Sequence, residues 1–266
     1  MTSGANLIRT ILENRSMVFA FAVRDLQGKY AGTLGQGIWM FAHPLAIIVI
    51  YYYVFAVGFR AQGPEGVPFI LWFVCGLIPW FFFAETLQSM TNAITGNVYL
   101  VKKIVFPTEL LAIIHLISGM IPHAVFLIML TGMLIFYNIP FEIERMIFLY
   151  YFMCSCMLLL GLGWLLSALQ VFYRDIGQAL TIILNMLFWL TPIVWSLELL
   201  PNKYHHLISY NPLFYIIEGY RGAMVYEHVI YPSVADSLYF WSVMVVILLI
   251  GKNLFMKLKP EFSDVL

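Results

Sequence analysis

Three side chains within one apolar segment of the sequence are of types that do acid–base or nucleophilic chemistry: His115, Ser118 and His123. The two histidines are eight residues apart, so a helix places them roughly on one face. A membrane-embedded transferase would need a nucleophile, a base and an orienting group, and no other residue completes such a set. We therefore interpret the histidines as structural residues with satisfied hydrogen bonds. The transferase remains a remote alternative.

Motifs that bind nucleotides or metals, or that activate a nucleophile, are absent from the sequence. It contains no G-x-x-x-x-G-K-[ST], no G-x-S-x-G and no H-E-x-x-H. The cysteines Cys75, Cys154 and Cys156 lie inside apolar segments, without the spacing of a zinc site or a disulfide framework. We expect no metal and no cofactor in this chain. Any ATP that drives it must be bound, with magnesium, by another polypeptide.

The composition is that of a protein that lies mostly in lipid. Of 266 residues, 62% are hydrophobic and 11% are charged, and the mean hydropathy is +0.88. A soluble domain carries about 25% charged residues. The formal net charge is zero and there is no basic tract, so nucleic acid is not an expected partner.

Six segments offer close to the 20 apolar residues with which a helix crosses about 30 Å of hydrocarbon. We therefore predict an all-α polytopic membrane protein with six transmembrane helices in one domain, residues 1–266. Residues 1–34 would form an N-terminal interface helix and its connection, and residues 35–266 the six-span bundle. The predicted spans are 39–58, 69–90, 110–136, 146–171, 176–195 and 238–255.

The distribution of lysine and arginine predicts the orientation. With the N-terminus inside, ten of the 14 basic residues lie on the inner side and four on the outer side. Cytoplasmic loops carry the excess of such residues, so both termini should be cytoplasmic. The inner set is Arg9, Arg15, Arg24, Lys29, Lys102, Lys103, Arg174, Lys252, Lys257 and Lys259, and the outer set is Arg60, Arg145, Lys203 and Arg221.

The segment 7–30 precedes the first span and has an apolar stripe opposite a polar face. The polar face holds Arg9, Glu13, Asn14, Asp25 and Lys29. Such a segment is too charged to span a membrane and is suited to the interface plane. The alternative is a soluble helix packed on another domain.

The segment 94–111 lies between the second and third spans and predicts a short amphipathic cytoplasmic helix. Val98, Val101 and Val105 fall at i, i+3 and i+7, while Lys102 and Lys103 point elsewhere. Pro107 then ends the helix. A structured protrusion at this place suits a docked partner, although a charged loop that only fixes the topology would show the same charges.

Between the fifth and sixth spans, residues 196–237 are broken by proline. The apolar stretch 207–217 is too short to span and is interrupted by Pro212. We predict two short helices, 203–209 and 213–226, that dip into the membrane from the outer face, where buried backbone is tolerated. An ordinary outer loop is the alternative.

Aromatic residues make up 17% of the chain. Trp72, Trp80 and Trp189 should lie deeper than an interface belt, and the flat face of an aromatic ring can slide along the C–H faces of a sugar. Core packing alone would also explain most of these rings. Glu85, near the cytoplasmic end of the second span, would face a conduit or pair with a neighbouring cation, and simple placement at the interface is the alternative.

The order of several short motifs resembles the membrane subunit of ABC-2-type polysaccharide exporters, which move lipid-linked O antigen or wall teichoic acid. The likeness covers nearly the whole chain, and the motifs are specific in their joint order. They are Val23-Arg24-Asp25-Leu26-Gln27-Gly28-Lys29-Tyr30 with Leu34-Gly35, then Leu100-Val101-Lys102-Lys103-Ile104-Val105-Phe106-Pro107, Tyr173-Arg174-Asp175-Ile176, Trp189-Leu190-Thr191-Pro192-Ile193, and Asn211-Pro212-Leu213 with Glu218-Gly219-Tyr220-Arg221.

The resemblance implies a permease subunit, not an enzyme, of the bacterial inner membrane. It would pair with a second copy of itself and two ABC ATPase subunits, and carry a lipid-linked glycan outward. The implied coupling residues are Thr95, Asn97, Val98, Leu100, Val101, Lys102, Lys103 and Phe106, with Arg24, Lys29 and Tyr30 on the interface helix. The implied conduit residues are Trp39, Tyr52, Trp72, Trp80, Phe83, Glu85 and Trp189, and the implied outer gate is Tyr204, His205, Tyr210, Tyr215, Tyr220 and Arg221.

Related classes share these features. A capsule or teichoic acid exporter and a small-molecule ABC-2 permease would have the same coupling helix. In each case we expect a two-state mechanism in which ATP binding moves the coupling helices and the fifth span bends at Pro192.

Overall fold

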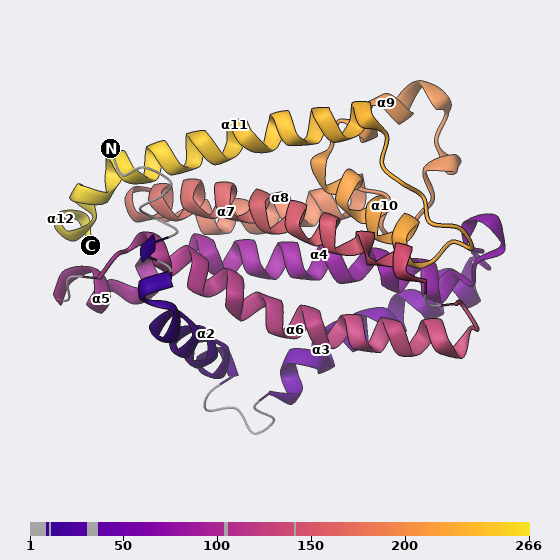
Figure 1. Cartoon of the computed structure of the whole chain (residues 1–266), viewed down its shortest axis with the longest axis horizontal. Coiled ribbons are helices and arrows are strands. Elements are labelled where there is room, and N and C mark those ends of the chain that lie inside the picture. The colour runs from indigo at the N-terminus through magenta and orange to yellow at the C-terminus, as the bar shows by residue number, and fades with distance from the viewer. Residues whose placement is uncertain (1–8, 11, 31–36, 104–105, 141) are drawn as a thin grey trace.

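The computed structural model describes residues 9–10, 12–30, 37–103, 106–140 and 142–266. Across these residues the protein is helical and has no β-strand, as predicted. Long helices run side by side along one axis, and short helices gather at the two ends (Figure 1). The connection 31–36 and the end of the predicted coupling segment, 104–105, lie outside the described residues.

Five of the described helices are long and apolar enough to cross a membrane. They confirm five of the predicted segments, with ends that differ by a few residues. These helices are α3 (Ile38–Tyr52) continued by the π-helix η1 (Tyr53–Gly58), α4 (Phe69–Thr91), α6 (Glu109–Phe136), α7 (Phe148–Phe172) preceded by η4 (Ile143–Ile147), and α11 (Val234–Leu258).

The fifth predicted segment, 176–195, forms a shorter helix than expected. Helix α8 (Ile176–Leu190) has 15 residues, which span about 22 Å. Thr191 is extended, with φ −92° and ψ 135°, because the following Pro192 disfavours a helical conformation in the residue before it. Pro192 therefore ends the helix and does not kink it. Residues 191–194 continue inward as buried, non-helical chain.

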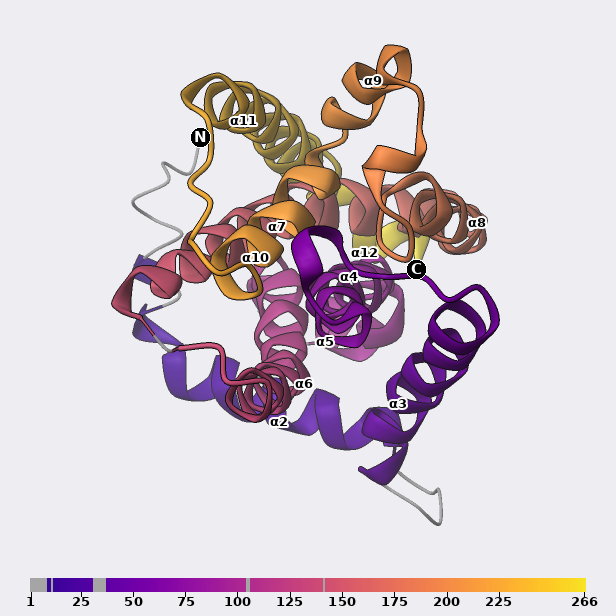
Figure 2. The same cartoon turned by 90° about the vertical axis from the view of Figure 1, so that its right-hand side faces the viewer.

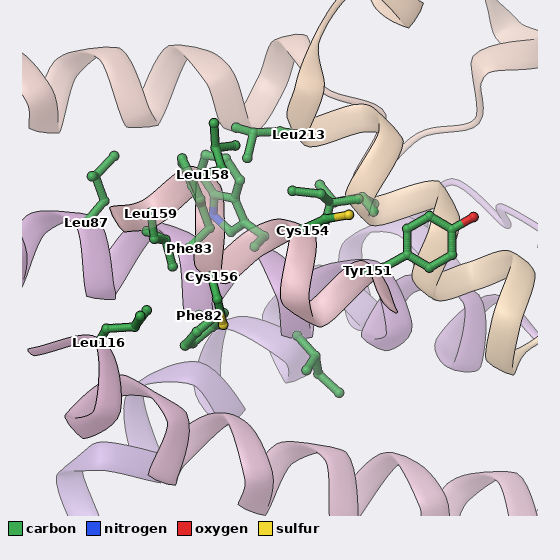
Figure 3. Packing of buried hydrophobic residues seen from close by; sticks show 14 of the residues in the cluster. Phe82, Phe83, Leu87, Leu116, Tyr151, Cys154, Cys156, Leu158, Leu159 and Leu213 are labelled. Atoms are coloured by element: carbon green, nitrogen blue, oxygen red, sulfur yellow. The ribbon is translucent and has the colours of Figure 1, made fainter. Parts of the chain in front are cut away.

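Helix α4 is the centre of the bundle. In its most apolar stretch 78% of the residues are buried, against 11% in α3 and 17% in α11. It contacts α6, α7, α8 and α10, and Figure 3 shows side chains of α4, α6, α7 and α10 meeting in one apolar core. Helix α11 packs on α7 at Gly161 and Gly251, where an added Cβ on Gly251 would collide with the Gly161 carbonyl.

The short helices divide between the two ends of the bundle (Figure 1). One end carries α2 (Arg15–Tyr30), η3 (Thr95–Asn97), α5 (Val98–Lys103), η7 (Lys259–Glu261) and α12 (Phe262–Val265). The opposite end carries η2 (Pro64–Gly66), η5 (Leu197–Leu199), η6 (Asn202–Tyr204), α9 (His205–Ser209) and α10 (Pro212–Met224). Helices therefore stand where the sequence predicted a coupling helix and a broken outer segment.

A buried arginine joins the end of α8 to α4 and α10. The Arg221 side chain is 0% exposed and donates to the carbonyl oxygens of Pro192, Ile193 and Trp72 at 2.7, 2.7 and 3.2 Å. It also pairs with Glu218, and its guanidinium carbon lies 3.6 Å from the centre of the Trp72 ring. The carbonyl groups of the non-helical stretch are thereby satisfied inside the protein.

A second buried arginine holds the C-terminal end of α10 and the chain that follows it. Arg145 donates from Nε to the Pro140 carbonyl at 2.8 Å, and from Nη1 to Met224 and Tyr226 carbonyls at 3.0 and 3.1 Å. The sequence placed Arg145 and Arg221 among the outer charges. The structure buries both, because the chain end of α10 and the end of α8 leave carbonyl groups that need donors.

We expect Arg221→Lys to lower the free energy of unfolding by roughly 2–4 kcal/mol, because an ammonium group cannot reach three carbonyl oxygens and a carboxylate in this fork geometry. The measurement is the thermal unfolding midpoint in detergent. Arg60→Lys is the control, since Arg60 is exposed. Equal midpoints for the two variants would contradict a structural role of Arg221.

Candidate functional site

A cavity of about 890 Å³ lies between α3, α4 and α8. Side chains of these three helices form most of its wall, and Asp25 of α2, His115 of α6 and the η3 residues Gly96 and Asn97 close the end nearer α2 and α5. Figure 2 shows α3 set apart from α8, with α4 between them and further inside the bundle. Helices α3 and α8 therefore flank the cavity, and α4 forms its wall on the side of the core.

The half of the cavity nearer α2 and α5 is polar. Glu85, Gln88, Ser89 and Asn92 recur at i, i+3, i+4 and i+7 on α4, so they share one face, and that face lines the cavity. Helix α8 contributes Thr181 and Asn185, and α3 contributes His43. Gln88 ties the two walls together: its amide donates to the Gly177 carbonyl at 3.2 Å and its oxygen accepts from the Thr181 hydroxyl at 3.4 Å.

The half of the cavity farther from α2 and α5 is aromatic. Tyr51 of α3 stacks on Phe188 of α8 with ring centres 5.8 Å apart, and Trp80 of α4 lies 5.5 Å from Phe188. These three rings line the cavity above the amide and hydroxyl groups. The wall thus offers hydrogen-bonding groups next to flat apolar faces, which is a combination that suits sugars.

The predicted conduit residues separate into three groups. Trp80 and Glu85 line the cavity. Trp39, Tyr52 and Trp189 are exposed, at 56%, 40% and 52%, on the helices that flank it. Trp72 and Phe83 are 3% exposed and belong to the core, so the structure gives them a packing role, Trp72 beneath Arg221.

Several cavity residues were missed from the sequence. They are the uncharged polar residues Gln88, Asn92, Thr181 and Asn185, whereas the sequence predicted a conduit of aromatic and ionisable residues. The signal was present: amides repeat at helical spacing within otherwise apolar segments, where a polar side chain is costly unless it faces protein or water.

A second cavity of about 710 Å³ lies between α2, α5 and α6. It holds Arg24 and Tyr99, and it shares Asp25, Gly96, Asn97 and His115 with the first cavity. The two cavities therefore meet at these four residues, at the end of the bundle that carries α2 and α5.

Asp25 occupies this junction, and its position corrects the predicted polar face of the first helix. Asp25 Oδ1 lies 3.2 Å from His115 Nδ1, and the two side chains are 19% and 10% exposed. Helix α2 lies against α6 with Val18 and Ala22 buried, and Asp25 follows Ala22 by three residues, so it falls on the same face. Arg24 is exposed, and the side chains of Lys29 and Tyr30 lie outside the described part of the structure.

The predicted coupling residues surround α5. Thr95, Asn97, Val98, Leu100 and Val101 are half-buried, and Leu100 and Val101 pack against the core. Phe106 contacts Phe21 of α2, with ring centres 5.9 Å apart. Lys102 is exposed, and the Lys103 side chain lies outside the described part. Tyr99 lies on the same helix and is 62% exposed, and it was not among the predicted coupling residues.

The six predicted gate residues fall into two sets. Tyr204 and Tyr210 are exposed, and His205 Nε2 lies 3.0 Å from the nearby Leu200 carbonyl oxygen. In contrast, Tyr215 bonds to Tyr150 and Ser237, each at 2.9 Å, and Tyr220 and Arg221 are fully buried. Tyr210 is nevertheless joined to α11, because its carbonyl accepts from the Tyr239 hydroxyl at 3.0 Å and its ring centre lies 5.4 Å from that of Tyr239.

The histidines and serine of α6 do not form one site. His123 Nε2 lies 3.1 Å from the Tyr220 hydroxyl and stacks on Phe152, whereas His115 contacts Asp25 and Ser118 is buried. Among the described residues, no group of three or more His, Cys, Asp or Glu is arranged to hold a metal ion. His115 and His123 therefore have separate partners, and neither makes a hydrogen bond to Ser118.

Long apolar helices around a polar and aromatic cavity define a multi-pass membrane protein with a binding or conducting space. A model of the ABC-2 type transporter family matches residues 17–225. The chain belongs to this family, as its resemblance led us to expect.

Individual relatives cover nearly the whole chain. It is 27% identical over 259 residues to the O-antigen export system permease protein RfbA of Klebsiella pneumoniae, covering 91% of this chain and 92% of that protein. It is 23% identical to RfbA of Myxococcus xanthus over 97% of this chain and 98% of the relative. It is also 23% identical to the polysialic acid transport protein KpsM of Escherichia coli, over 78% and 81% of the two chains.

A cysteine placed in the cavity should react with a polar maleimide. We expect Asn185→Cys to be labelled on the order of tenfold faster than the wild type, whose Cys75, Cys154 and Cys156 are all buried. The measurement is the labelling rate of purified protein by mass spectrometry. Ala168→Cys, at a buried position of α7, is the matched control and should stay unlabelled. Equal rates at residues 168 and 185 would contradict an open cavity.

Proposed function

We propose that the protein is the membrane-spanning subunit of an ATP-driven exporter that moves a lipid-linked polysaccharide from the cytoplasmic to the outer side of a bacterial inner membrane. The observation that carries this proposal is the cavity between α3, α4 and α8, with amides and hydroxyls next to Tyr51, Trp80 and Phe188. Similarity to permeases named for O-antigen and polysialic acid export supports it.

The bundle has six spans in this proposal. Helix α8 crosses together with the non-helical residues 191–194, which are buried and whose carbonyl groups accept from Arg221. Helix α2 lies along the inner surface, and α9 and α10 form the re-entrant outer segment. Residues 1–34 and 35–266 belong to one domain, because α2 packs directly on α6.

Both termini are cytoplasmic in this proposal. Two of the four outer basic residues, Arg145 and Arg221, are buried in hydrogen bonds to carbonyl groups and present no charge to the outside. The exposed excess of lysine and arginine therefore lies at the end that carries α2 and α5. The same end carries α12, which contacts α5.

A second copy of the chain completes the conduit. Helices α3 and α8 flank the cavity and expose apolar side chains, among them Ile50, Tyr53, Ile183 and Met186. When these faces of two copies come together, they would cover the apolar side chains. The path between the copies would then be lined by the main cavity of each copy. Two ABC ATPase subunits supply the energy through α5, and the chain 196–210, in which Tyr204 and Tyr210 are exposed, moves as the outer gate.

The coupling surface can be tested at Tyr99, which is 62% exposed on α5. We expect the Tyr99→Asp variant to insert into the membrane normally. Its binding to an ABC ATPase, which is identified by its P-loop, should weaken by on the order of tenfold or more, because a charge replaces an aromatic side chain at the contact. Val101→Asp is a less clean variant, since Val101 packs against the core. The measurement is the amount of ATPase that co-purifies.

Tyr137→Asp is the matched control, because Tyr137 is 38% exposed at the opposite end of the bundle. It should keep the ATPase. If Tyr99→Asp retained the ATPase as well as Tyr137→Asp does, α5 would not be the coupling helix.

Export itself is tested by reconstitution with the ATPase in vesicles. A neutral polysaccharide on a polyprenyl diphosphate carrier is supplied on the ATPase side, and its exposure on the other side is followed with a lectin that binds the sugar chain. We expect exposure that depends on ATP and is abolished when the P-loop lysine of the ATPase is replaced. Transport of small amphiphilic drugs without glycan transport would instead favour a small-molecule permease.

A further inference from the structure

A small pocket of about 30 Å³ lies between α4 and α6, next to the main cavity. Phe81 and Glu85 of α4 line both spaces, so the pocket adjoins the main cavity at these two residues. Its volume suits about one or two water molecules and is too small for a sugar. The other lining residues are Leu26 of α2, Ile78, Phe82 and Thr86 of α4, and Ser118, Gly119, Pro122, His123 and Phe126 of α6.

Two buried hydroxyl groups in the wall of this pocket make no hydrogen bond to any other residue that the structure describes. They belong to Thr86, which is 2% exposed, and to Ser118, which is 0% exposed. The Thr86 hydroxyl is directed toward α6, because an added Cβ on Gly119 would collide with it. Leaving a buried hydroxyl without any partner is costly, so both groups call for a polar partner inside the pocket.

Pro122 adds a third polar group on the same face of α6. In an unbroken helix the N–H of residue 122 would donate to the Ser118 carbonyl oxygen one turn earlier, but proline has no N–H. Ser118 and Pro122 both line the pocket, so this carbonyl lies on the helix face that forms the pocket wall. Ordered water is one of the groups that satisfy a carbonyl freed by proline in a membrane helix.

We infer that the pocket between α4 and α6 is a buried hydration site, in which water bonds to the Thr86 and Ser118 hydroxyls and to the Ser118 carbonyl oxygen. A buried water typically makes about three hydrogen bonds, and these groups supply them. Water enters from the main cavity, where Phe81 and Glu85 line both spaces. The bound water joins α4, the central helix of the bundle, to α6 beside Pro122.

The test is X-ray footprinting of the full-length protein in lipid nanodiscs, in water labelled with heavy oxygen. The X-ray pulse converts water to hydroxyl radicals, which add their oxygen to adjacent aromatic rings. Phe82 and Phe126 line the pocket but not the main cavity, and both are buried. We expect these two rings to take up heavy oxygen severalfold faster than Phe255, which is also buried and lines neither space.

The double variant Thr86→Val with Ser118→Ala removes both hydroxyls and leaves the water too few partners to stay bound. We expect it to lose most of the labelling of Phe82 and Phe126. Ser155→Ala is the matched control and should label like the wild type. The Ser155 hydroxyl is also buried without a hydrogen bond to another described residue, but it lines neither space.

The hydration site would be overturned if Phe82 and Phe126 of the wild type were labelled no faster than Phe255. Wild-type labelling of these rings in a folded double variant would overturn it as well. Should the double variant fail to fold, the comparison within the wild type decides alone.

Discussion

The satisfaction of backbone carbonyl groups by Arg221 is the interaction on which the outer half of the bundle depends. Helix α8 is too short to cross the hydrocarbon alone, and its continuation is buried and non-helical. In such surroundings an unpaired carbonyl group costs several kcal/mol. One guanidinium supplies donors to the Pro192, Ile193 and Trp72 carbonyls, and Glu218 and the Trp72 ring offset the cost of burying its charge.

The same interaction determines the shape of the cavity. Helix α8 is joined to α4 at its outer end through Arg221 and at its inner end through Gln88, which bonds to Gly177 and Thr181. Gly76 allows this arrangement, because an added Cβ there would collide with the Arg221 guanidinium. The two cavity walls formed by α4 and α8 are therefore joined by hydrogen bonds. The third wall, α3, is less embedded in the protein, since only 11% of its apolar stretch is buried.

The length of the apolar segments predicted the long helices, because a helix needs about 20 apolar residues to cross the hydrocarbon of a membrane. The prolines predicted the positions of the short helices, because Pro107 follows α5 and Pro212 separates α9 from α10. Such patterns do not reveal tertiary contacts. Asp25 was placed on a polar face and lies against His115, and Trp72, a predicted conduit residue, lies beneath Arg221. Neither partner is near in sequence, so no local pattern could reveal these pairs.

Burial of arginine also changes how the charge distribution should be interpreted. The rule that relates lysine and arginine to topology concerns charges that remain in flanking loops. Arg145 and Arg221 donate to carbonyl groups inside the protein, so they act as structural donors and not as loop charges. Counting them as outer charges understates the asymmetry between the two ends. Removing them leaves Arg60 and Lys203 as the exposed outer basic residues, which strengthens the argument for a cytoplasmic α5.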